Sequence, residues 1–149
     1  MLQNLISGVK ITQATTVDAG VAAATAIKGS AIDMSDYETC LFVVSFGTIT
    51  SGAVTSIKVQ QSDDTTDGNF ADLTGTSVTV ADTEDNTTFY VEVTKPQKRY
   101  IRLYISRGTQ NAVVGAALAL QANGRVKPAV QDTTVTRGEL WLSPDPGTA

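Results

Sequence analysis

One loop of the sequence carries acidic residues at a spacing that could bind calcium. Asp63, Thr65 and Asp67 occupy positions 1, 3 and 5 of such a loop, and Gly68 supplies the glycine of position 6. Position 12 requires a bidentate glutamate but is Thr74, and the flanking residues favour strands rather than helices. We therefore interpret this segment as a solvated hairpin loop and expect no bound metal.

Basic and aromatic side chains gather in a second segment, where five of the 11 Lys and Arg residues lie: Lys95, Lys98, Arg99, Arg102 and Arg107. Tyrosines interleaved with them would be typical of a platform that stacks single-stranded nucleic acid. The formal net charge of -4 opposes binding to such a polyanion. We therefore predict a protein contact, with another copy or a partner, since Arg and Tyr are enriched in interface cores. The predicted contact residues are Arg99, Tyr100, Arg102 and Tyr104.

The sequence offers no residues for the commonest catalytic sites. It contains no histidine, which excludes Ser-His-Asp and Cys-His catalysis and imidazole-ligated zinc. Its one cysteine, Cys40, can form neither an intrachain disulfide nor a thiolate cluster, and its apolar neighbours predict an inert buried thiol. No glycine-rich phosphate loop is present. We expect a protein without enzymatic activity or cofactor.

The sole tryptophan lies near the C-terminus, between Leu140 and Leu142, in a segment that holds three of the four prolines. One interpretation is that this tail folds back over its own domain. The other is that Leu140, Trp141 and Leu142 anchor in a pocket of another subunit or partner, as aromatic residues at interface hot spots do. We predict a second anchor at the N-terminus that orders only on assembly. Its residues are Leu2, Leu5 and Ile6.

The elements that must position these residues are short strands. A chain of 149 residues with 42% hydrophobic residues suits one domain with a sizeable core. In 37–47, alternation places Cys40, Phe42, Val44 and Phe46 on one strand face. Leu41 and Val43 take the other face, so we expect that strand to be covered on both sides.

Two further segments alternate more regularly. In 54–61, Ile57 and Val59 point inward while Lys58 and Gln60 point outward. In 98–106, one face carries Ile101, Leu103 and Ile105, and the other carries the tyrosines with Arg102 between them. Seven or eight such strands separated by turns predict an all-β protein, an antiparallel β-sandwich of the jelly-roll type.

Both ends of the chain differ from its middle. Apolar residues are sparse near the start, and proline, which cannot donate to a strand ladder, is concentrated near the end. We therefore predict an N-terminal arm over 1–19, a sandwich domain over 20–127 and a C-terminal arm over 128–149. The start lacks the pattern of a signal peptide, and the longest apolar run, 112–120, is too short to span a bilayer. We expect an unsecreted protein without a membrane partner.

Four segments together resemble a known family: Ile32–Gly47 (IDMSDYETCLFVVSFG), Ile57–Asp64 (IKVQQSDD), Asn69–Leu73 (NFADL) and Lys98–Ile105 (KRYIRLYI). They resemble the capsid decoration (cement) proteins of tailed bacteriophages, which have jelly-roll cores. About half of the chain carries this resemblance.

The resemblance implies a structural virion protein that is made in the host cytoplasm and sits on the outer surface of an assembled capsid. It implies a homotrimer that bridges neighbouring major capsid protein subunits and needs no nucleic acid. Three linked copies would multiply weak contacts by avidity. Two alternatives stay open. One is a carbohydrate-binding β-sandwich module on a virion surface, and the other is a head–tail or tail structural component.

Overall fold

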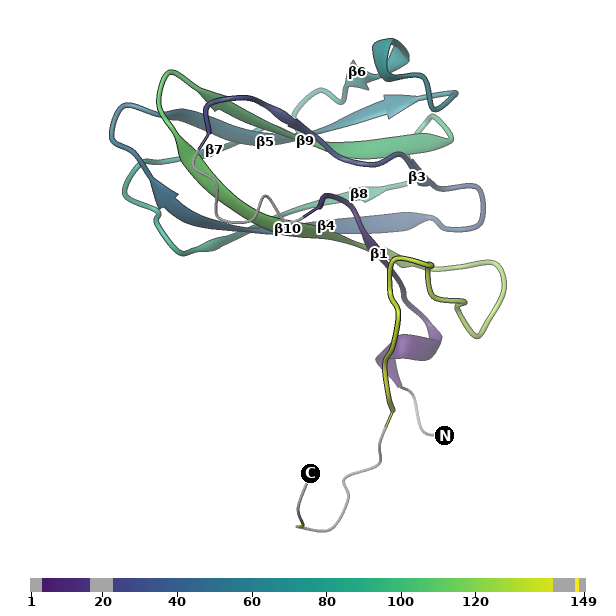
Figure 1. Cartoon of the computed structure of the whole chain (residues 1–149). Helices are drawn as coiled ribbons and strands as arrows, with labels where there is room; N and C mark the ends of the chain where they lie inside the picture. The colour runs from purple at the N-terminus through teal and green to yellow at the C-terminus, as the bar shows by residue number, and fades with distance from the viewer. Residues whose placement is uncertain (1–3, 17–22, 141–146, 148–149) are drawn as a thin grey trace.

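Two antiparallel sheets packed face to face form the body of the protein. The computed structural model describes residues 4–16, 23–140 and 147, and Figure 1 shows the two layers that their strands make. Sheet A contains, in spatial order, β1 (Lys10–Gln13), β10 (Ala112–Ala122), β4 (Thr39–Ile49) and β8 (Thr88–Thr94). Its two outermost strands are therefore β1 and β8.

Sheet B is built on two long central strands, β9 (Tyr100–Gly108) and β5 (Val54–Ser62), which pair with each other. Short strands flank them: β2 (Ile27–Lys28) and β3 (Ile32–Asp33) pair with β9, and β6 (Ala71–Asp72) and β7 (Val78–Val80) pair with β5. The described residues also form two 3₁₀ turns, η1 (Leu5–Ser7) and η2 (Asp67–Asn69). All the strand pairs are antiparallel, which confirms the predicted all-β sandwich.

The core lies between the sheets and uses the inward faces that alternation predicted. Its fully buried side chains include Cys40, Phe42 and Val44 of β4, Ile57 and Val59 of β5, and Ile101, Leu103 and Ile105 of β9. β10 contributes mainly small residues to this layer, and the phenylalanines of β4 fill the remaining volume. The Phe46 and Phe89 rings meet edge to face, with their centroids 5.6 Å apart.

The structure corrects the boundary of the predicted N-terminal arm. Lys10–Gln13 is a sheet strand, paired with β10 in the register Ile11↔Leu120 and Gln13↔Leu118. Only four residues long, it lacks the repeated alternation by which longer strands are recognised. The arm as predicted over 1–19 is therefore too long, because its second half contains an edge strand of sheet A.

The start of the predicted C-terminal arm runs alongside β1 without joining the sheet as a strand. The Ala129 N–H donates to the Ser7 carbonyl at 2.9 Å, and the Asp132 N–H to the Ile11 carbonyl at 3.4 Å. Side chains complete the edge, since the Gln131 Oε1 accepts from the Ile11 N–H at 2.8 Å and the Thr134 Oγ1 from the Gln13 N–H at 3.0 Å. The outer edge of β1 is therefore covered by residues 129–134.

Candidate interaction surfaces

The outer faces of the two sheets differ in chemistry. On sheet A, one row across the strands is Ile11, Leu120, Leu41 and Glu92, and the next is Gln13, Leu118, Val43 and Tyr90. We call Ile11, Leu41, Val43, Leu118 and Leu120 the apolar face. Leu118 is 40% exposed and the other four are half-buried. Leu41 and Val43 are thus less covered than the sequence predicted.

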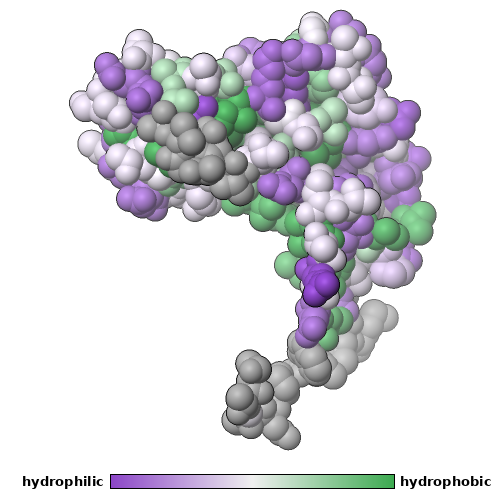
Figure 2. All heavy atoms as spheres, in the orientation of Figure 1, coloured by the Kyte–Doolittle hydropathy of each residue, from purple (hydrophilic) through white to green (hydrophobic). Residues whose placement is uncertain are grey.

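An apolar outer face is unusual for an antiparallel sheet, which ordinarily presents polar residues to water. A contiguous apolar surface that stays partly open to solvent, as this one does around Leu118, is typical of an interaction site. Figure 2 shows apolar atoms along the side of the sandwich that meets the terminal segments. The corresponding face of sheet B is polar, carrying Lys58, Gln60 and Ser62 opposite Tyr104, Arg102 and Tyr100.

The sequence predicted that Arg102 points into solvent, but in the structure its side chain is covered. Its Nε–H donates to the Gln60 Oε1 at 2.8 Å, its Nη1 forms an ion pair with Asp67, and its Cζ lies 4.1 Å from the centroid of the Phe70 ring. The Arg102 side chain is only 7% exposed, and Gln60 is buried with it. Alternation placed both residues on the correct face of the sheet, but the loop 63–70 folds over that face. The prediction that Arg102 is a contact residue is therefore wrong. Its side chain holds this loop against sheet B.

Two acidic residues of that loop, Asp63 and Asp67, form ion pairs with cations on or next to the strands of sheet B. The Asp67 carboxylate accepts from both Lys28 and Arg102, and Asp63 pairs with Lys98 at 2.8 Å. Among the described residues, no group of three or more His, Cys, Asp or Glu side chains could hold a metal ion.

Arg99, Tyr100 and Tyr104 lie where a partner can reach them. The Arg99 guanidinium pairs with Asp33, with 2.7 Å between Nη2 and Oδ2, and its Cζ lies 5.1 Å from the Tyr100 ring centroid. The Lys58 ammonium is 4.9 Å from the Tyr104 ring centroid. Their role as contact residues stays a prediction.

The Arg99 ion pair makes stability depend on pH. Hydrogen bonds from the Arg99 guanidinium lower the pKa of Asp33 to about 2, below its ordinary value of 3.8. Because the folded state holds the proton less tightly, this pair stabilises the fold above pH 4, and the contribution disappears as pH falls from about 4 through 2. We expect Asp33→Asn to lower the free energy of unfolding at pH 7, and to lose less of it than the wild type does between pH 4 and 2. Urea unfolding of the wild type and the variant at several pH values across that range measures this difference. Parallel curves of unfolding free energy against pH would contradict the prediction.

Cys40 is an inert position in the structure. Its side chain is fully buried in β4, and burial raises the pKa of the thiol to about 12. The thiolate required of a nucleophile or metal ligand is therefore absent at neutral pH.

The predicted terminal anchors are partly visible. Leu5 is 81% exposed, Ile6 36% and Leu140 60%. Leu2, Trp141 and Leu142 lie outside the described residues. In Figure 1, η1 and the described part of the C-terminal segment extend from the same side of the body, below sheet A. The apolar ends and the apolar face therefore share one side of the molecule.

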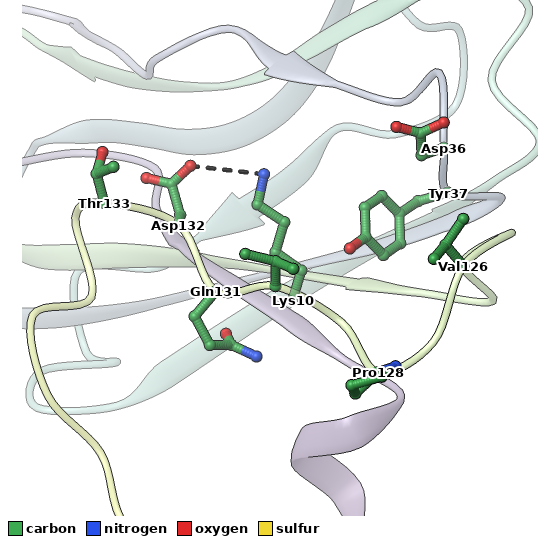
Figure 3. A pocket seen from close by; sticks show the side chains of 9 residues that line it. Lys10, Asp36, Tyr37, Val126, Pro128, Gln131, Asp132 and Thr133 are labelled. Carbon is green, nitrogen blue, oxygen red and sulfur yellow. Dashed lines mark ion pairs between the residues drawn. The ribbon is translucent and has the colours of Figure 1, made fainter.

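A cleft of about 400 Å³ separates the terminal segments from the turn before β4 (Figure 3). Tyr37, Val126 and Pro128 line it, and the Lys10 Nζ lies 3.5 Å from the Asp132 Oδ2. The ion pair ties β1 to the C-terminal segment. Sequence reasoning missed Gln131, Asp132 and Thr134, which hold that segment, because nothing in their spacing indicates a partner more than a hundred residues away.

A second cleft, of about 490 Å³, is lined by the basic residues Lys95, Lys98, Arg99 and Arg125, together with Glu38. It lies at the end of the sandwich where β9 begins.

No helix in the described ranges is long and apolar enough to cross a membrane.

Comparison with known proteins adds no assignment to these surfaces. No protein-family model matches the chain. No curated protein matches it significantly.

Proposed function

We propose that this protein is a structural component of a tailed-bacteriophage virion that binds the outer surface of the assembled capsid and bridges neighbouring major capsid protein subunits. One observation carries the proposal: the apolar face of sheet A and the exposed apolar residues of both terminal segments lie on the same side of a rigid body. An apolar sheet face with both terminal segments projecting from one of its ends fits a broad protein surface better than a small ligand.

The strand order supports the jelly-roll part of the proposal. If β2 with β3, and β6 with β7, are each counted as one interrupted strand, the sandwich has eight strands. Sheet A then has the order first, eighth, third, sixth, and sheet B the order second, seventh, fourth, fifth. Two interlocked Greek keys produce such an arrangement, which is that of a jelly roll.

The mechanism we propose is mechanical. β4 and β10 are each eleven residues long, and the continuous antiparallel ladder between them, from Ala117↔Val44 to Ala122↔Thr39, makes the sandwich resist deformation. Burying the apolar face against one shell subunit gives affinity, and the terminal segments reach a second subunit. Each contact can be weak, because linkage within one rigid body raises the effective concentration of the next.

The test adds the purified full chain to undecorated shells assembled from the major capsid protein of the same phage and measures co-sedimentation. We expect the wild type to bind and Leu118→Lys to weaken binding at least tenfold, since a charge would be buried at the centre of the contact. Val54→Lys is the matched control, because Val54 is 63% exposed on sheet B. Failure of the wild type to bind, or equal binding by Leu118→Lys, would refute the proposal.

A further inference from the structure

Within the described part of the chain, three of the four sheet edges are protected and one is open. Sheet B is flanked on both sides by strands of only two or three residues. The β1 edge of sheet A is covered by residues 129–134. The β8 edge is seven residues long, and no hydrogen bond from a described residue reaches its outer backbone. Its sequence, TFYVEVT, contains no proline or lysine, the residues that commonly block pairing at an edge.

The pairing with β4 fixes which backbone groups of β8 face outward. The Phe46 N–H donates to the Thr87 carbonyl at 2.9 Å, and the Lys95 N–H to the Glu38 carbonyl at 2.6 Å. Antiparallel pairing alternates, so the odd-numbered residues of β8 bond to β4. The N–H and C=O groups of Thr88, Tyr90, Glu92 and Thr94 therefore point to the open edge.

We propose that the β8 edge pairs with the β8 edge of a second copy, antiparallel, about a two-fold axis at Val91. In this register Tyr90 of one copy lies opposite Glu92 of the other, and Thr88 lies opposite Thr94. All four outward-facing residues of each strand gain hydrogen-bonded partners. On the inner face, Phe89 lies opposite Val93 and Val91 opposite its own equivalent, which are favourable cross-strand pairs.

The sequence of β8 favours this register over the two nearest alternative registers. Moving the axis to Glu92 would place two carboxylates directly opposite each other, a destabilising arrangement. Moving the axis to Tyr90 would leave Thr94 without a partner. The strand also ends sharply, because Lys95 has a φ of 52° and Pro96 follows it. Tyr90, 70% exposed in the single chain, would be covered by the pairing.

The proposed pair is compatible with the apolar face but does not depend on the proposed function. A two-fold axis perpendicular to the sheet joins the two A sheets into one of eight strands and leaves both apolar faces on the same side. It also differs from the homotrimer that the family resemblance implies, since an isologous edge contact closes at two copies.

The test compares two double variants at the same two positions by sedimentation equilibrium. Thr88→Lys/Thr94→Lys places lysine opposite lysine at both ends of the contact and should raise the dimer Kd about tenfold. Thr88→Lys/Thr94→Glu places lysine opposite glutamate and should leave the Kd within about threefold of the wild type. Both positions are exposed in the single chain, so neither variant disturbs the core.

Amide hydrogen exchange provides an independent readout in the wild type. The N–H groups of Thr88, Tyr90, Glu92 and Thr94 should become protected as protein concentration rises, whereas those of Phe89, Val91 and Val93 should be protected at every concentration. A wild type that stays monomeric, a trimer without protection of the outward-facing amides, or equal Kd values for the two double variants would overturn the proposal.

Discussion

Replacing Phe42 by alanine is expected to lower the free energy of unfolding by about 4 kcal/mol, the largest effect we predict for a single side chain. Phe42 has no exposed surface and lies at the centre of sheet A, opposite Ala119 of β10 and Val91 of β8. Because β10 presents alanine at this level, the aromatic ring fills space that no neighbour can occupy. Ladders on both sides of β4 prevent the backbone from closing the cavity.

Urea unfolding followed by circular dichroism measures this loss. Leu118→Ala is the matched control, since it removes a large apolar side chain from the adjacent strand at a site that is 40% exposed. We expect the control to cost less than about 1 kcal/mol, because little surface is newly exposed and no enclosed cavity forms. A loss for Phe42→Ala no larger than that of the control would contradict the packing described above.

The core was predictable because long strands repeat their alternation. The inward residues of β4, β5 and β9 were recognised from periodicity alone, and the structure buries all of them. Alternation has a period of two residues and says nothing about distant pairing. The order of strands in each sheet, and the four-residue strand β1, therefore required the structure.

The candidate surfaces were predictable only in part, for the same reason. Periodicity placed Arg102 on the outer face of sheet B, yet Asp67 and Phe70, more than thirty residues earlier, cover it. Similarly, the pattern showed that Leu41 and Val43 face away from the core. Whether another strand covers them depends on the tertiary structure, which the pattern does not contain. Among the described residues no strand lies over them, and sheet A therefore has an apolar outer face.

Gly29→Ala is expected to lower the free energy of unfolding by about 3 kcal/mol, through overpacking rather than through a cavity. A Cβ at Gly29 would lie 2.8 Å from the Leu103 carbonyl oxygen and 3.1 Å from that of Ala14. Neither atom belongs to a flexible side chain, so relief requires backbone movement. The segment cannot move freely, because the Gly29 N–H donates to the Leu103 carbonyl at 2.8 Å and the Ser30 N–H to the Ala14 carbonyl at 2.7 Å.

These two hydrogen bonds join β9 of sheet B to the residue that follows β1 of sheet A, so the damage at Gly29 should reach both layers. Gly68→Ala separates this effect from the general cost of adding a methyl group, since nothing lies within 4 Å of a Cβ there. We expect it to change stability by less than about 0.5 kcal/mol. Thermal and urea unfolding of both variants measure the difference. Equal midpoints would mean that the link between the sheets at Gly29 is looser than these distances indicate.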